Sequence, residues 1–127
     1  MSEIKCGEIA FSHVTVDATN TAQALNSGSL PVFATPMMIA LMENAAMRAI
    51  SHHLEDTESS VGIQINVSHD LASPIGAEII AKATVIAVDR RKITFEVEAK
   101  QGDKTIGKGT HTRFIVTNAS FLNKISL

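Results

Sequence analysis

The sequence predicts an α+β fold, in which an antiparallel β-sheet curls around a single long α-helix. One apolar segment, residues 32–50, has helical spacing and is long enough to cross a small domain. Segments of strand type follow it, and most of the connections between them are short turns. Wrapping such a sheet around an apolar helix is the simplest way to bury both. Because 127 residues suffice for one core, we expect a single domain over residues 1–127.

The helix is predicted from the segment VFATPMMIALMENAAMRAI, residues 32–50, which is apolar around most of the helical circumference. Thr35 and Pro36 indicate its start, because a threonine hydroxyl can cap the first turn and proline suits the first helical position. The helix should run to about His53. The polar, turn-rich residues 18–31 before it predict a loop or flap.

Strands are predicted from apolar–polar alternation and from residues of strand type. They cover residues 7–17 before the helix and residues 61–69, 77–88, 93–100 and 105–116 after it. In the strand at 93–100, the side chains of Ile93, Phe95 and Val97 should be buried. The short polar segments between the later strands predict hairpin turns.

The strand at 61–69 carries its apolar residues at odd positions, which should face the helix. These residues are Val61, Ile63, Ile65 and Val67. The whole arrangement is the hotdog fold. Since one such layer leaves a sheet edge and a helix flank uncovered, we expect a homodimer.

Composition excludes several classes of function. A net charge of −2 and the absence of Trp and Tyr argue against nucleic-acid binding by charge or by stacking. The single cysteine, Cys6, excludes an internal disulfide framework. The first ten residues lack the apolar core of a signal peptide, and charges interrupt the apolar helix, so neither secretion nor a membrane span is expected. We expect a cytoplasmic protein.

One charged residue stands out in the apolar helix. At about 100° per residue, Glu43 lies within the predicted buried face, where a carboxylate is costly unless it is paired or protonated. His69 continues the odd positions of its strand and should point to the same face. Glu43 and His69 can therefore form an acid–imidazole site between helix and sheet. The alternative is a structural pair, with the glutamate bonded to backbone and the histidine packed in the core.

Two further positions have both a structural and a functional reading. Thr35 either caps the helix or contacts a ligand at the helix N-terminus, where free N–H groups polarise a carbonyl. In the last strand Gly107, Gly109, His111 and Arg113 fall on one face, and glycines there indicate close approach of a ligand or of another backbone. Arg113 can pair with an inward carboxylate, or it can be a surface arginine at a bulge.

No metal site and no cofactor are expected. His52 and His53 are adjacent, so on a helix their side chains should diverge, and the sequence contains no HxxxH motif. It also lacks a GxSxG nucleophile elbow and a phosphate-binding GxxxxGK[ST] loop.

Three segments taken together resemble the hotdog-fold fluoroacetyl-CoA thioesterase and its relatives. The segments are VFATPMMIALMENAAMRAI, GIQINVSH and GKGTHTR, which agree with that family in order and spacing. The resemblance implies a catalytic set of Thr35, Glu43 and His69. It also implies that Gly62 binds the substrate carbonyl and that Arg113 helps to organise the site.

The activity that this resemblance implies is hydrolysis of a short acyl-CoA thioester, in a homodimer with sites near the subunit interface. Two alternatives are a non-catalytic acyl-CoA-binding dimer and a hotdog hydratase or dehydratase. The chain departs from the family where that enzyme has phenylalanines over its pocket, since the matching stretch offers Asn26 and Ser29. Asn44 also replaces a tryptophan, and Pro36 replaces a glycine. Selectivity for the fluoroacetyl group is therefore not expected.

Overall fold

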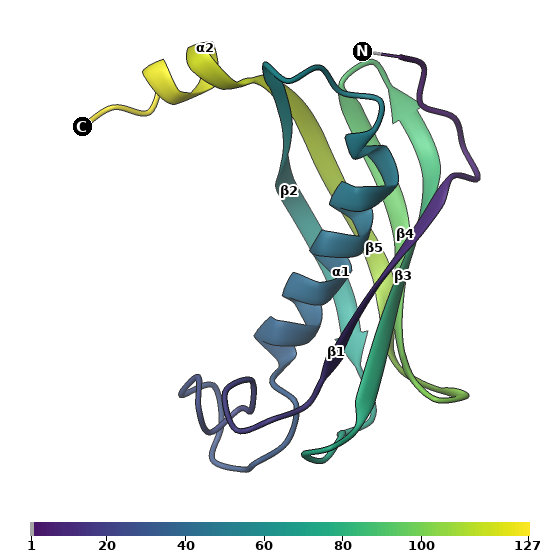
Figure 1. Ribbon diagram of the computed structural model, residues 1–127, viewed down its shortest axis with the longest axis vertical. Helices are drawn as coiled ribbons and strands as arrows, with labels where there is room; N and C mark the ends of the chain where they lie inside the picture. Colours follow the sequence, from purple (N-terminus) through teal and green to yellow (C-terminus); the bar gives the residue numbers. More distant parts are fainter. Residues whose placement is uncertain (1) are drawn as a thin grey trace.

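The computed structural model describes residues 2–127 and contains one five-stranded antiparallel sheet and two helices. The elements in chain order are β1 (Ile9–Thr15), α1 (Thr35–Ser51), β2 (Glu58–His69), β3 (Glu78–Asp89), β4 (Lys92–Gln101), β5 (Lys104–Thr117) and α2 (Asn118–Asn123). The strands lie in the order β1-β3-β4-β5-β2, so β1 and β2 form the two edges. The sheet curls around α1, which lies along its concave side (Figure 1). This is the architecture predicted from the sequence.

The core lies between α1 and the middle of the sheet. On the helix, the large side chains Met38, Met42 and Ile50 are fully buried. The sheet contributes Ile93, Phe95 and Val97, which are buried as the alternation of β4 predicts. Each such side chain stabilises the fold by about 1.5–3 kcal/mol relative to its exposed state. These contacts hold α1 against the sheet, and the helix carries Thr35 and Glu43.

Strand β2 departs from the predicted alternation, because its pairing with β5 shifts register between Gly62 and Gln64. Such a bulge adds one residue and reverses which positions face the helix. Gly62 faces α1, whereas Val61 and Ile63 line a groove on the outer face of the sheet. Beyond the bulge the odd positions face inward, since Ile65 pairs with a buried histidine of β5. The predicted inward orientation is therefore wrong for Val61 and Ile63.

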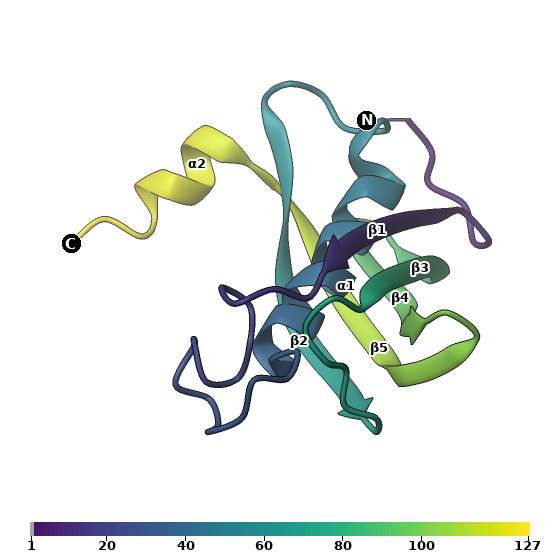
Figure 2. The ribbon, with the colours of Figure 1, turned by 60° about the horizontal axis from the view of Figure 1, so that its bottom comes forward.

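The short helix α2 was not predicted from the sequence. It follows β5 directly and projects from the body of the molecule, as both ribbon views show (Figures 1 and 2). None of its residues is buried. The apolar side chains of Leu122 and Ile125 at this end of the chain are 60% and 61% exposed.

Neither described helix is long and apolar enough to cross a membrane. The cytoplasmic location expected above stays a prediction.

Candidate active site

The first part of the candidate site joins the start of α1 to the end of β2. The Thr35 hydroxyl lies 2.7 Å from Nδ1 of His69. The residue in the capping position is Ala34, and no side chain caps the helix. The predicted capping role of Thr35 is therefore wrong: Thr35 is already helical, and its hydroxyl bonds to an imidazole.

A small cavity opens beside this pair. Its volume is about 260 Å³, and its lining includes Phe33, Thr35 and His69. The loop before the helix contributes Ala22 and Ser27, so the segment predicted as a flap does border the candidate site.

The other ring nitrogen of His69, Nε2, is buried and has no hydrogen-bond partner among residues 2–127. A buried polar atom without a partner costs free energy unless a ligand or a water satisfies it. Burial also lowers the pKa of His69, although the Leu71 backbone carbonyl and the charge of Asp70 partly oppose this shift. His69 is therefore mainly neutral at pH 7, a form in which one ring nitrogen can accept a proton.

The second part of the site surrounds Glu43, about two turns further along α1. Its Oε2 lies 3.9 Å from Nη1 of Arg113. Arg113 is held firmly, because its Nε donates to the Ser60 hydroxyl and its Nη2 donates to the Ser60 carbonyl, each over 2.8 Å. The expected pairing of Arg113 with an inward carboxylate is thus present. Burial lowers the pKa of the guanidinium, while the negative charge of Glu43 opposes this.

His111 completes this second group from β5. Its Nδ1 lies 2.8 Å from the carbonyl oxygen of Gln64, which can only accept, so Nδ1 carries the proton. Nε2 then accepts from Nη1 of Arg113 over 3.2 Å. Burial and the nearby Arg113 charge lower the pKa of His111, in agreement with a neutral ring.

Gly62 lies directly against these groups. A Cβ atom at this position would be 2.8 Å from Oε2 of Glu43 and 3.1 Å from Cε1 of His111. Only glycine leaves room there for the carboxylate in its present position. The glycines of β5 also permit close approach, as expected: a Cβ at Gly107 would meet the Ser68 carbonyl oxygen and Met38.

The side chain of Glu43 is less buried than predicted, since 42% of its surface is exposed. On the same face of α1, Pro36, Ala40 and Met47 are also exposed. The helical repeat identified a continuous apolar stripe, but only part of it is buried; that part carries Met38, Met42, Ala45, Ala46, Ala49 and Ile50. Glu43 stands at the edge of the covered part.

The structure thus brings Thr35 together with His69, and Glu43 together with Gly62 and Arg113. No hydrogen bond or ion pair among residues 2–127 joins the two groups. Sequence reasoning missed Ser60 and His111 as members of the second group. The alternation of β5 placed His111 on the correct face, whereas no pattern singled out Ser60.

Comparisons with known proteins agree with this fold. The family model of the fluoroacetyl-CoA-specific thioesterase (FlK) matches residues 16–119. The fluoroacetyl-CoA thioesterase of Streptantibioticus cattleyicolor is 38% identical over 94 residues, which are 74% of this chain and 68% of that protein. A solved structure of the fluoroacetyl-CoA thioesterase FlK matches with a TM-score of 0.92 and 32% identity, over 98% of this chain and 96% of that one. A hot-dog-like protein from Thermanaerovibrio acidaminovorans shares the fold, with a TM-score of 0.83 and 20% identity, over 94% of this chain and 87% of that one.

The curled sheet, its central helix and these relatives define a thioester hydrolase with the hotdog fold. Within that class, the chain belongs to the fluoroacetyl-CoA-specific thioesterase family. The resemblance drawn from three sequence segments is confirmed.

Proposed function

We propose that this hydrolase cleaves the thioester of a short acyl-CoA, with Thr35, Glu43 and His69 as its catalytic residues. The Thr35–His69 hydrogen bond at the edge of a small cavity carries the proposal. It places a neutral imidazole, whose second nitrogen lacks a partner in residues 2–127, beside a cavity that part of a substrate can enter.

In the reaction, water attacks the carbonyl carbon of the thioester and gives up a proton to a base. The tetrahedral intermediate then collapses, the carbon–sulfur bond breaks, and the CoA thiolate leaves with little need for assistance. His69 is suited to move the proton because it is neutral near pH 7. Glu43 acts as the base for this water. In the alternative route its carboxylate attacks the thioester and forms an acyl anhydride as the thiolate leaves, and water then hydrolyses the anhydride.

Gly62 and Arg113 are proposed as substrate-binding residues. Because Gly62 has no side chain, the space beside the Glu43 carboxylate stays open. The backbone N–H of Gly62 can stabilise the carbonyl oxygen of the substrate as negative charge develops on it. Arg113 is anchored by Ser60 and keeps a positive charge near Glu43. Since Glu43 is partly exposed, we assign this ion pair a contribution of at most about 1 kcal/mol. Its main role is to hold the carboxylate in place.

The size of the cavity supports a short acyl group. A cavity of about 260 Å³ is smaller than the roughly 300–1,000 Å³ of sites for drug-sized ligands. Asn26 and Ser29 lie in the loop before α1. This loop matches the stretch in which the fluoroacetyl-specific enzyme has the phenylalanines that cover its pocket. Selectivity for a fluorinated acyl group is therefore not part of the proposal.

We also propose a homodimer. Strand β2, of 12 residues, pairs with β5 on one side only and forms an edge of the sheet in residues 2–127. Next to it the flank of α1 exposes Pro36, Ala40 and Met47. An open edge beside an apolar helix flank is a surface that a second copy can cover. Light scattering after size exclusion should give twice the mass of the chain.

The test is free-thiol release from a panel of short acyl-CoAs, from acetyl to phenylacetyl. We expect turnover in the unmodified protein and its loss in His69→Ala and in Glu43→Gln. The matched controls are His13→Ala and Glu96→Gln, which change exposed residues of β1 and β4 and should retain activity. Near-normal turnover in Glu43→Gln would remove Glu43 from the mechanism. Binding of acyl-CoA without thiol release would favour a non-catalytic acyl-CoA-binding protein.

A further inference from the structure

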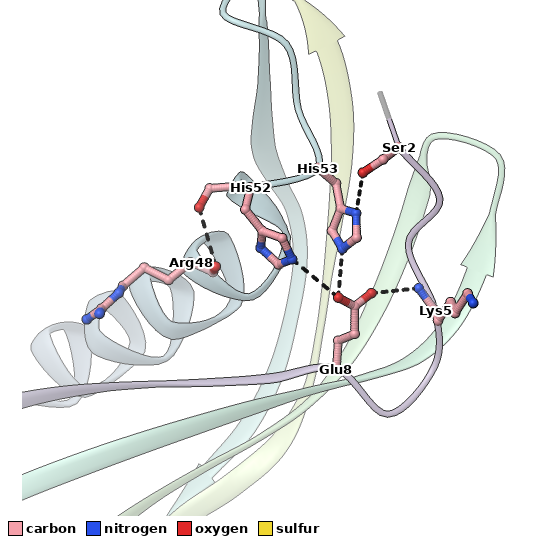
Figure 3. Close-up of polar contacts among 7 residues, drawn as sticks. Ser2, Lys5, Glu8, Arg48, His52 and His53 are labelled. Carbon is pink, nitrogen blue, oxygen red and sulfur yellow. Dashed lines mark hydrogen bonds and ion pairs between the residues drawn. The ribbon is translucent and has the colours of Figure 1, made fainter.

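A second cluster of reactive side chains lies at the opposite end of α1 from Thr35. Glu8, just before β1, meets His52 and His53, which follow the last helical residue (Figure 3). Oε1 of Glu8 lies 2.7 Å from Nε2 of His53 and 3.5 Å from Nε2 of His52. The three ligand atoms all lie within 4.8 Å of one another.

The two histidines converge because the helix ends before them. Helix α1 stops at Ser51, and His52 occupies the position that caps its C-terminus. The rings lie 4.1 Å apart between centroids, and both direct Nε2 towards the same carboxylate oxygen. The expectation that adjacent histidines diverge on a helix is therefore wrong, since it assumed that the helix continues through them.

The other atoms of two of these side chains are already held in place. The Ser2 hydroxyl lies 2.6 Å from Nδ1 of His53, and the backbone N–H of Lys5 donates to Oε2 of Glu8 over 2.7 Å (Figure 3). Partners of this kind orient the ligands of a metal and set the tautomer of a ligating histidine. The cluster also lies at the C-terminus of α1, where the helix dipole favours a cation.

We propose that Glu8, His52 and His53 form a binding site for a divalent transition metal ion of the Zn²⁺ class. In Zn²⁺ sites the bonds to nitrogen and oxygen are about 2.0–2.2 Å, so tetrahedral ligands lie about 3.3–3.6 Å apart. The 3.5 Å between Glu8 and His52 falls within this range. The 2.7 Å between Glu8 and His53 is a hydrogen-bond distance and must lengthen when the ion takes the place of the proton. Water supplies the fourth ligand. Binding at Nε2 requires the proton between Glu8 and His53 to leave that nitrogen. The neutral ring then carries its single proton on Nδ1, which donates to the Ser2 hydroxyl, and any excess proton passes to solvent.

The ion in this site has a structural role, because α1 separates it from the candidate active site. The helix has 17 residues and, at about 1.5 Å per residue, spans about 25 Å. The metal ties the segment around Glu8 to the C-terminal end of α1. Thr35 and Glu43 lie on the same helix, at its first residue and near its middle. We therefore expect it to raise thermal stability and to leave thioester hydrolysis unchanged.

The experiment is titration of the metal-free full chain with Zn²⁺ by calorimetry, with Co²⁺ absorption as a second readout. We expect one ion per chain and a higher melting temperature with Zn²⁺. The His52→Ala variant should bind Zn²⁺ at least about tenfold more weakly. Loss of a residue that only hydrogen-bonds to a metal ligand already lowers metal affinity by about 10- to 100-fold. His52→Ala retains the His53–Glu8 contact, and Glu8→Gln provides a second variant that retains a side chain of similar size.

The matched control is His13→Ala, which removes an exposed histidine of β1 outside the cluster and should bind as tightly as the unmodified chain. The proposal is overturned if the unmodified chain takes up no stoichiometric ion. It is also overturned if His52→Ala and Glu8→Gln retain full affinity, or if His13→Ala loses as much as they do. Thiol release in EDTA is measured in parallel, so failure of the metal site and failure of the proposed hydrolysis are distinguished.

Discussion

The Thr35 hydroxyl and Nδ1 of His69 are 2.7 Å apart, although the two residues are 34 positions apart in the chain. This contact connects the first residue of α1 with the last residue of β2. It fixes the orientation of an imidazole whose other nitrogen is buried without a partner in the described chain.

Removing the Thr35 hydroxyl should reduce turnover far more than stability. We expect Thr35→Val, which preserves the shape of the side chain, to lower kcat at least about tenfold. A general acid or base raises the rate by about 10²–10⁴-fold, and only when it is correctly oriented. Thr35→Ser restores the hydroxyl and should retain most of the activity. Initial rates of thiol release and melting curves measure both effects. Equal rates for the Val and Ser variants would show that the hydrogen bond has no catalytic role.

The pH dependence should reflect the lowered pKa of His69. If neutral His69 moves the proton, kcat/KM rises with pH through the pKa of this residue. Because burial lowers that pKa, the acidic limb should lie below pH 6.5, the ordinary value for histidine. A limb above pH 6.5 contradicts the assignment. The limb is measured with a substrate that does not titrate in this range.

Stability should fall in acid for the same reason. Burial lowers the pKa of both His69 and His111, so the unfolded chain takes up protons at these residues more readily than the folded one. Their stabilising effect is complete above pH 6.5, the ordinary value for histidine, and is lost as the pH falls through their folded-state pKa values. Urea unfolding between pH 5 and pH 8, conditions chosen around the reference pKa of about 6.5, should show this slope. His111→Gln should reduce the slope, whereas His13→Ala should not.

A methyl group at position 62 should disturb the carboxylate of Glu43. In Gly62→Ala the new Cβ would lie 2.8 Å from Oε2, so the partly exposed Glu43 side chain must move. We expect at least about a tenfold loss of activity, since misplacement of a reacting group by about 1 Å can cost about 10². The fold should survive, because the far end of a flexible side chain can give way. Ile63→Ala, which alters the outer face of the same strand, is the control and should remain active.

Arg113 should matter for stability as well as for the site. Arg113→Met leaves the Ser60 carbonyl and Nε2 of His111 without their donor. Each unsatisfied buried group costs about 1–3 kcal/mol, so for these two groups we expect the free energy of unfolding to fall by about 2–6 kcal/mol. Arg90→Met changes a side chain that is 95% exposed and should shift this free energy by less than about 0.5 kcal/mol. Chemical unfolding of both variants measures the difference.

The sequence by itself determined the features that depend on local periodicity. The apolar helix, the alternation of β4 and the inward positions of His69 and Arg113 all follow from repeats of 3.6 or 2 residues. These predictions succeed because burial of one face imposes a pattern that neighbouring residues share. The catalytic set of Thr35, Glu43 and His69 is implied by the resemblance of the three motifs and stays a proposal.

Only the tertiary structure decided the features that depend on register and on chain path. The bulge in β2 turned Ile63 outward and Gly62 inward, although the apolar alternation runs unbroken through both. The end of α1 at Ser51 allowed His52 to converge with His53 on Glu8. The partner of Thr35 is likewise set by where β2 ends. Each of these contacts joins segments far apart in the chain, so no local pattern encodes it.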